Sequence, residues 1–230
     1  MPAPFEEEAA LRRQLVRYSK ALYRLGYMPG TSGNLSVRFG PKTLLATPTG
    51  CSKSMLKPED IVVTDLDGRR ISGSRNVTSE IAMHVAIYRA RPDVKAVVHS
   101  HPPIATGFAC AGKSLDEPLC AEAIMILGPV PLAPYATTGT KELATSLASL
   151  AADHTAILMA NHGAVTYGDS ISDGFMKMET LEHFANICLV ANQLGTARPL
   201  GHTAISDLMT AKAKYLANAN VMKSPISISA

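Results

Sequence analysis

The chain has few cysteines, only four among 230 residues. Cys51, Cys110, Cys120 and Cys188 lie far apart and form no C-x-x-C pair. This spacing is not that of a disulfide-rich framework, so it indicates reduced thiols. None of the four has a neighbourhood typical of a nucleophile, and we expect them to pack as small apolar side chains.

The net charge is small, and long apolar runs are also scarce. The net charge is only +3, and no basic cluster with interleaved aromatic residues is present, which argues against nucleic-acid binding. No apolar stretch approaches the length that a membrane-spanning helix needs. The segment Met1–Glu8 is acidic where a secretory leader would be basic. We therefore expect a cytoplasmic protein that binds neither nucleic acid nor a membrane.

Length and hydropathy predict one core. With 47% hydrophobic residues, 230 residues suffice for one well-packed core and are few for two. We expect a single domain over residues 1–230, with a loose tail over residues 223–230.

The spacing of apolar residues predicts a mixed α/β fold. Apolar positions three and four apart predict helices over residues 6–26, 81–91, 104–111, 140–151 and 171–193. Short apolar or alternating runs predict strands over residues 35–39, 42–46, 61–64, 69–71, 94–99, 156–160 and 165–167. Weaker patterns cover residues 119–127 and 130–133. The early strands are locally connected, which favours a largely antiparallel sheet in a layered fold.

Three histidines follow buried strands. His99 ends the predicted strand 94–99, His101 follows it by two residues, and His162 follows the predicted strand 156–160. Alternate residues of a strand point to one face about 7 Å apart, so two imidazoles there can converge on one ion. Three neutral nitrogen ligands with an open position suit a divalent ion such as Zn²⁺ that acts as a Lewis acid. The alternative is that these side chains only bond loop carbonyls at a strand end.

Three short segments rich in hydrogen-bond donors lie where strands or helices meet loops. They contain Asn34, Thr49 with Gly50, and Thr78 with Ser79. A helix start exposes free backbone N–H groups, and hydroxyl donors beside it make a pocket for phosphate. The segments therefore predict an anionic substrate. The alternative is that Thr78 or Ser79 caps its helix and that the glycines serve turns.

Glu80 opens the predicted helix 81–91. An acidic residue there is commonly a capping or dipole partner. If this turn faces the histidines, the carboxylate could bind the ion in the empty site and serve as a general base once substrate displaces it. The remaining histidines lack placement at a strand end and are expected to be surface or packed residues; they are His84, His154, His183 and His202.

Six short runs complete the pattern between residues 16 and 167. They are Gly30–Ser36, Thr47–Gly50, Thr78–Glu80, Arg91–His101, Ala133–Tyr135 and Asn161–Gly163. In this order they resemble the class II aldolase/adducin family, which includes L-fuculose-phosphate aldolase and L-ribulose-5-phosphate 4-epimerase. The resemblance implies a three-layer αβα fold in which helices flank a largely antiparallel sheet.

The resemblance also implies roles for named residues. Zn²⁺, or another divalent ion such as Mn²⁺ or Co²⁺, would be held by His99, His101 and His162. Glu80 would complete the empty coordination sphere and act as the acid/base. The substrate phosphate would be bound by Asn34, Thr49, Gly50, Thr78 and Ser79.

Family members are typically homotetramers with active sites at subunit interfaces, and the same assembly is expected here. Tyr135 matches a tyrosine that the aldolases supply from the neighbouring subunit as a proton donor. Tyr215 is a candidate for a second tyrosine near the C-terminus.

The resemblance favours one reaction and leaves others open. The epimerases carry aspartate where this chain has Glu80, so glutamate favours reversible cleavage of a ketose 1-phosphate, such as L-fuculose 1-phosphate, to dihydroxyacetone phosphate and a small aldehyde. Alternatives are a 3-oxo sugar-acid-phosphate decarboxylase, an epimerase-like enzyme on the same metal site, and a non-catalytic interaction module of the adducin type. A decarboxylase needs a cation near the substrate carboxylate. Lys53 and Lys141 could supply it, although each also fits a solvated surface charge.

Overall fold

A computed structural model describes residues 4–223 of the chain, with side chains from residue 6 to residue 214. The predicted loose tail, residues 223–230, lies outside the described residues except for Lys223, which ends the last helix. The side chain of Tyr215 also lies outside the described part.

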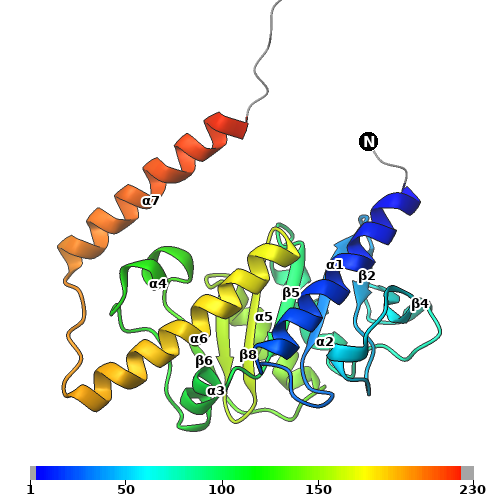
Figure 1. The fold of residues 1–230 in the computed structure, drawn as a ribbon, viewed down its shortest axis with the longest axis horizontal. Helices are drawn as coiled ribbons and strands as arrows, with labels where there is room; N and C mark the ends of the chain where they lie inside the picture. The colour runs from blue at the N-terminus through cyan, green and yellow to red at the C-terminus, as the bar shows by residue number, and fades with distance from the viewer. Residues whose placement is uncertain (1–3, 224–230) are drawn as a thin grey trace, which may run out of the picture.

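One eight-stranded sheet forms the centre of the molecule (Figure 1), with the strand order β4-β3-β2-β1-β5-β8-β7-β6. The strands are β1 (Asn34–Phe39), β2 (Thr43–Ala46), β3 (Val62–Asp65), β4 (Arg70–Ser72), β5 (Ala96–Ser100), β6 (Leu132–Ala133), β7 (Ala156–Met159) and β8 (Gly163–Gly168). The helices are α1 (Pro4–Arg24), α2 (Ile81–Ala90), α3 (Pro103–Cys110), α4 (Ala121–Ile126), α5 (Lys141–Ala151), α6 (Ile171–Leu194) and α7 (His202–Lys223), with 3₁₀ turns η1 (Lys53–Met55) and η2 (Pro58–Asp60).

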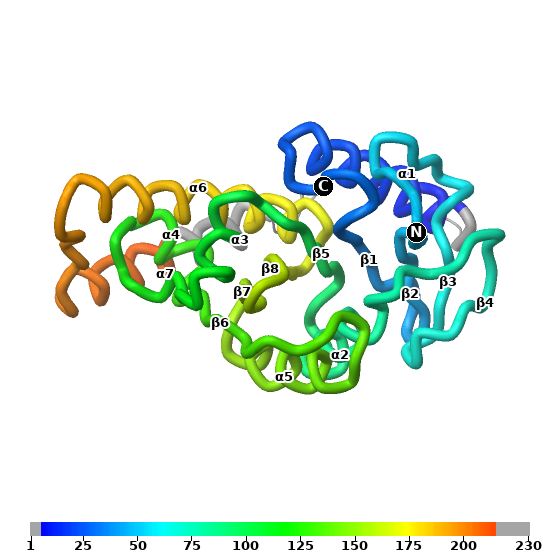
Figure 2. Tube along the Cα trace, turned by 90° about the horizontal axis from the view of Figure 1, so that it is seen from below, coloured from blue at the N-terminus to red at the C-terminus, as the bar shows by residue number. Residues whose placement is uncertain are grey.

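Helices cover both faces of this sheet. Helices α1, α3 and α6 lie on one face, and α2 and α5 lie on the other (Figure 2). Side chains alternate between the two resulting cores, since Ala96 and Val98 pack into the first and Val97 packs into the second. Every strand pair is antiparallel except β6 with β7. The predicted three-layer fold with a largely antiparallel sheet is confirmed.

The central strand β5 organises the functional region. It is buried along its whole length and pairs with β1 on one side and β8 on the other. In this register, His99 of β5 lies opposite Asn34 of β1 on one side and opposite Val165 of β8 on the other. The end of β5, the start of β1 and the turn before β8 therefore meet at one edge of the sheet.

The C-terminal helix α7 has no counterpart in the predicted elements. It leaves the body of the molecule and contacts α4 (Figure 1). Ile205, Leu208 and Met209 lie three and four residues apart on it, so helical spacing is present in this segment although the helix is missing from the predicted elements. None of the helices within residues 4–223 has the combination of length and apolarity needed to cross a bilayer.

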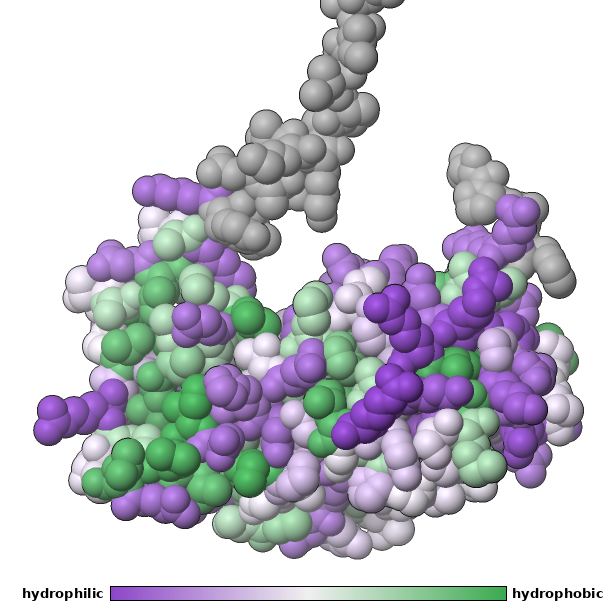
Figure 3. Space-filling view, viewed as in Figure 1, coloured by the Kyte–Doolittle hydropathy of each residue, from purple (hydrophilic) through white to green (hydrophobic). Residues whose placement is uncertain are grey.

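One face of the molecule differs in polarity along its length. Apolar side chains gather over α6 and α4, whereas charged side chains follow α1 (Figure 3). Val190 and Leu194 on α6 and Ile126 on α4 are among the exposed large apolar residues.

Candidate active site

The three histidines predicted as metal ligands lie together at the edge of the sheet where β5 ends and β1 begins. His99 is fully buried on β5, His101 follows the strand, and His162 lies in the turn between β7 and β8. Their ring centroids are 4.7 to 5.2 Å apart. One nitrogen from each ring lies within 4.8 Å of the others, so the three can reach a common ion.

The turn that carries His162 is shaped by its neighbours. Asn161 adopts a φ of 54°, in the left-handed region that asparagine tolerates better than most residues. At Gly163 a Cβ atom would lie 2.6 Å from His101 Cδ2 and 2.7 Å from the carbonyl oxygen of Ser100. Only glycine therefore allows this turn to approach the end of β5.

Hydrogen bonding and burial prepare two of the rings as ligands. His99 Nδ1 donates to the carbonyl oxygen of Ala164 at 2.9 Å, which leaves the lone pair of Nε2 facing the cluster when the ring is neutral. His101 Nε2 lies 3.1 Å from His99 Nε2. Burial, with the nearby His99 and His162, lowers the pKa of His101 to about 3. A ring that is neutral at physiological pH can bind a divalent ion.

Glu80 precedes α2 but makes no side-chain capping bond, so the capping alternative is wrong. Its Oε2 lies 3.3 Å from His99 Nε2, and its Oε1 lies 3.2 Å from His162 Nε2. Burial alone would raise the pKa of the Glu80 carboxyl. Favourable electrostatic interactions with His99 and His162 and a hydrogen bond from Asn34 outweigh burial and hold that pKa well below its usual range. The group is therefore a carboxylate at neutral pH.

The spacing of these atoms fits a metal ion. Ligand atoms about 2.0–2.1 Å from a tetrahedral ion lie roughly 3.3–3.4 Å from one another. Here the separations are 3.1 Å between two imidazole nitrogens and 3.2 and 3.3 Å between imidazole nitrogens and carboxylate oxygens. Glu80 Oε1 is buried and has no hydrogen-bond partner within the described part of the chain. Three imidazoles and one carboxylate are thus arranged to hold a divalent cation.

A cavity of about 380 Å³ joins this cluster to the predicted phosphate-binding segments. Its lining includes Glu80, His101 and His162 together with all five predicted phosphate ligands, Asn34, Thr49, Gly50, Thr78 and Ser79. It also includes residues without a predicted role in phosphate binding, namely Thr31, Ser32, Gly33, Pro48, Lys53 and Thr138. Hydroxyl donors and the histidine cluster therefore share one cavity.

The remaining candidates, Tyr135, Lys53 and Lys141, differ in their exposure and in whether they line the cavity. Tyr135 is 62% exposed and is not among the residues that line the cavity of its own chain. Lys53 lines that cavity and is only 1% exposed, so the interpretation of a solvated surface charge is wrong for this residue. Lys141 is exposed and lies outside the cavity lining, as a solvated lysine should.

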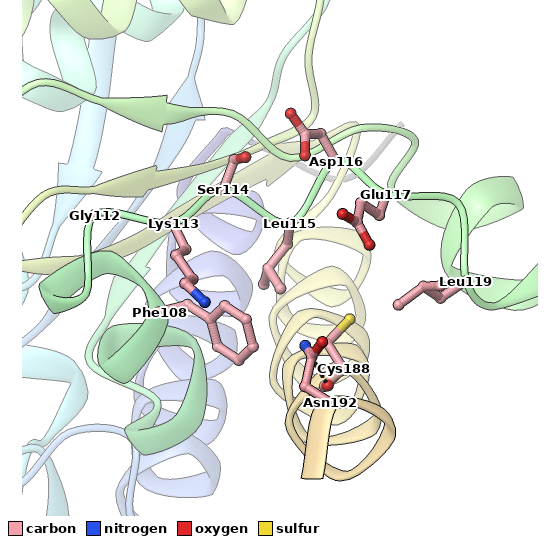
Figure 4. A pocket seen from close by; sticks show the side chains of 10 residues that line it. All are labelled: Phe108, Gly112, Lys113, Ser114, Leu115, Asp116, Glu117, Leu119, Cys188 and Asn192. Atoms are coloured by element: carbon pink, nitrogen blue, oxygen red, sulfur yellow. Dashed lines mark hydrogen bonds between the residues drawn. The ribbon is translucent and has the colours of Figure 1, made fainter. Parts of the chain in front are cut away.

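A separate cavity lies between α3, the segment 112–119 and α6 (Figure 4). Phe108, Cys188 and Asn192 contribute to its lining, and no histidine or predicted site residue does. Cys188 is a free, buried thiol, and burial raises its pKa to about 11. No imidazole of the described residues lines this cavity, so it lacks the ligands on which the predicted metal site depends.

His84 on α2 extends the site into the protein interior. It is fully buried, with Nε2 2.5 Å from Asn34 Oδ1 and Nδ1 2.7 Å from Ser36 Oγ. Because an amide oxygen only accepts, His84 Nε2 donates to it, and Nδ1 accepts from the Ser36 hydroxyl. Asn34 Nδ2 donates in turn to Glu80 Oε2 at 2.8 Å. A buried chain of hydrogen bonds thus runs from Ser36 to the Glu80 carboxylate.

Acid unfolding tests the neutral state of His84. Burial lowers its pKa from 6.5 to about 3. Between these values the unfolded chain binds one more proton than the folded chain, so the free energy of unfolding should fall by about 1.4 kcal/mol per pH unit as the pH decreases. His84→Gln should remove this contribution. Urea unfolding of metal-free wild type and variant at pH 4 to 7 measures the difference in slope.

The control for this experiment is His183→Gln, which alters an exposed histidine on α6 and should leave the slope unchanged. Equal slopes for wild type and His84→Gln would show that His84 is protonated in the folded protein.

Known proteins are similar to this chain in sequence and in fold. The family described as Class II Aldolase and Adducin N-terminal domain matches residues 13–189. The 3-oxo-tetronate 4-phosphate decarboxylase of Escherichia coli strain K12 is 37% identical over 187 residues, which cover 80% of this chain and 88% of that protein. The 5-deoxy-D-ribulose 1-phosphate aldolase of Bacillus thuringiensis serovar kurstaki is 36% identical over 199 residues, covering 86% and 92%. A solved L-fuculose 1-phosphate aldolase is 32% identical, with a TM-score of 0.83 and coverage of 90% and 96%. The chain therefore belongs to the class II aldolase and adducin family.

Proposed function

We propose that the protein is a metal-dependent lyase that breaks a carbon–carbon bond in a phosphorylated sugar. The leading reaction is reversible cleavage of a ketose 1-phosphate, such as L-fuculose 1-phosphate, to dihydroxyacetone phosphate and a small aldehyde. One observation carries this proposal: three imidazole nitrogens and an ionised carboxylate meet in a cavity whose wall is rich in hydroxyl donors. The family membership supports it.

The metal ligands are His99, His101 and His162, joined by Glu80 when no substrate is bound. Zinc suits this ligand set, and Mn²⁺ and Co²⁺ are alternatives. When bound, the ion acts as a Lewis acid toward the negative charge that develops on the substrate's ketone and neighbouring hydroxyl oxygens as the bond breaks. This reaction needs no lysine that forms a Schiff base with the substrate ketone.

Protein residues move the protons. In the direction of synthesis, Glu80 removes a proton from the carbon beside the ketone of dihydroxyacetone phosphate. Tyr135 of the neighbouring subunit then donates its phenolic proton to the aldehyde oxygen as the new bond forms. Cleavage runs through the same two transfers in reverse. The phosphate is held by Asn34, Thr49, Gly50, Thr78 and Ser79.

A decarboxylation is the second candidate, because the relatives named as decarboxylases are as similar to this chain as the aldolase is. A 3-oxo-tetronate 4-phosphate has its ketone and phosphate on adjacent carbons, as dihydroxyacetone phosphate does. Loss of carbon dioxide leaves the same enediolate, and a proton that Glu80 takes up from solvent and passes to carbon converts it into dihydroxyacetone phosphate. The two reactions therefore differ in the group that departs.

We further propose a cytoplasmic homotetramer of single-domain subunits, with active sites at the interfaces. Tyr135 is exposed on its own chain, and the apolar surface over α6 and α4 offers area for subunit contacts (Figure 3). Glu80 in place of aspartate disfavours the epimerase-like alternative. Presence of the complete ligand set argues against a non-catalytic interaction module.

Metal removal tests the proposal. Dialysis against EDTA should lower the cleavage of ketose 1-phosphates by at least about a hundredfold, because the ion is the Lewis acid that would stabilise the enediolate. Adding Zn²⁺, Mn²⁺ or Co²⁺ should restore it. Borohydride with substrate should leave the enzyme active, since no imine forms.

The assay should measure aldehyde, carbon dioxide and dihydroxyacetone phosphate from both substrate classes. Aldehyde indicates the aldolase, and carbon dioxide indicates the decarboxylase. Full activity after complete removal of metal would contradict both.

A further inference from the structure

Lys53 connects two loops of the active-site cavity. Its ammonium group donates to the carbonyl oxygen of Thr31 at 3.0 Å and to that of Cys51 at 3.2 Å. Thr31 belongs to the loop before β1, and Cys51 follows the Thr49–Gly50 segment. These loops form the hydroxyl-rich wall of the cavity. The lysine thus lies directly beside the predicted phosphate ligands.

The charge of Lys53 is not balanced by an acidic neighbour. Among residues 6–214, no carboxylate oxygen lies within 4.0 Å of its Nζ atom, and its hydrogen bonds are to neutral carbonyl groups. A buried cation without an anionic partner is costly, because it has lost its hydration. Burial accordingly lowers the pKa of Lys53, and the nearby Cys51 and Glu80 oppose this effect only in part.

Lys53 is also unique within the cavity. Of the described residues that line it, Lys53 is the only lysine or arginine. The other donors on this wall, such as Thr49, Thr78 and Ser79, are neutral. A phosphate dianion bound by neutral groups alone would lack charge-assisted hydrogen bonds, which are about twice as strong as neutral ones.

We propose that Lys53 is the specificity-determining residue of this cavity, where its ammonium group is the charge partner of the substrate phosphate. The inference rests on the proposed function and deepens it, because both candidate substrates carry a phosphate beside the ketone. A substrate carboxylate is the other anion to consider. A carboxylate that departs as carbon dioxide must lie at the reacting carbon, beside Glu80 and the histidines, whereas Lys53 is bonded to the loops beside Thr49 and Gly50.

Binding of inorganic phosphate to the zinc-loaded full chain tests the inference. Lys53→Gln keeps an amide donor for the two carbonyl groups and removes the charge. It should weaken phosphate binding about tenfold or more in calorimetry at low salt. Zinc content should stay unchanged. For turnover, KM of the phosphorylated substrate should rise by more than kcat falls.

Lys141→Gln is the matched control, because it removes the same charge from an exposed lysine outside the cavity. Its phosphate affinity should stay within about twofold of wild type. Lys53→Met, which preserves the length of the apolar stem, is the second variant. If neither variant at position 53 folds, NMR of the wild-type lysine Nζ groups decides, because phosphate should shift the signal of the buried ammonium.

The results separate the inference from the proposed function. Unchanged phosphate affinity in folded Lys53→Gln, or no NMR shift on phosphate addition, would overturn the inference even if cleavage is metal-dependent. A loss of affinity confined to 3-oxo acid phosphates would assign Lys53 to the carboxylate and overturn it as well. Phosphate binding that depends on Lys53 in a protein without lyase activity would support the inference and contradict the function.

Discussion

Glu80→Gln is expected to lower kcat about a thousandfold, which is within the range for loss of a general acid/base. Glutamine has the same shape, and its amide oxygen can still accept from Asn34 Nδ2. It cannot take up a proton from carbon. The step can be isolated by following exchange of the carbon-bound proton of dihydroxyacetone phosphate with D₂O by NMR, without aldehyde. This exchange should fall by the same factor as kcat.

Glu182→Gln provides a matched control for this substitution. Glu182 is as buried as Glu80, each 8% exposed, but its carboxylate accepts from the backbone N–H groups of Ile104 and Ala105 at the start of α3. The change should cost about 1–2 kcal/mol of stability and alter kcat only a few-fold. Proton exchange at the wild-type rate in zinc-loaded Glu80→Gln would show that another group is the base.

The strands and the three histidines of the cluster could be predicted because their signals are local. Alternation over two residues places Ala96 and Val98 in one core and Val97 in the other, and it also sets His99 and His101 at the end of one buried strand. His162 is marked by the apolar strand before it. The sequence could not show that the two strand ends meet, because that depends on the pairing of β5 with β8.

The interior of the site could not be predicted, because its signals are not local. His84 occupies an ordinary helical position, and only the packing of α2 against β1 brings it to Asn34 and Ser36. Lysine is rarely fully buried, so composition favours a solvated Lys53. Its burial results from the approach of two loops that are about 20 residues apart, which no periodicity records.

Mixing two inactive variants tests the predicted role of Tyr135. Tyr135→Phe removes the phenolic proton and should abolish aldol cleavage, as should Glu80→Gln. If each active site takes Glu80 from one subunit and Tyr135 from its neighbour, random mixed tetramers contain some sites with both native residues. Equal co-expression should then restore about a quarter of wild-type activity, because each native residue is present with a probability of about one half.

The same experiment distinguishes this arrangement from its alternatives. If Tyr135 acted within its own chain, no subunit of a mixed tetramer would carry both native residues. The mixture would then be as inactive as each variant alone. The exposure of Tyr135 and its absence from the lining of its own cavity favour the shared site. Decarboxylation needs no proton at a departing aldehyde. Two results together would therefore identify the enzyme as the decarboxylase. The variant Tyr135→Phe would release carbon dioxide at the wild-type rate, and the wild type would not cleave ketose 1-phosphates.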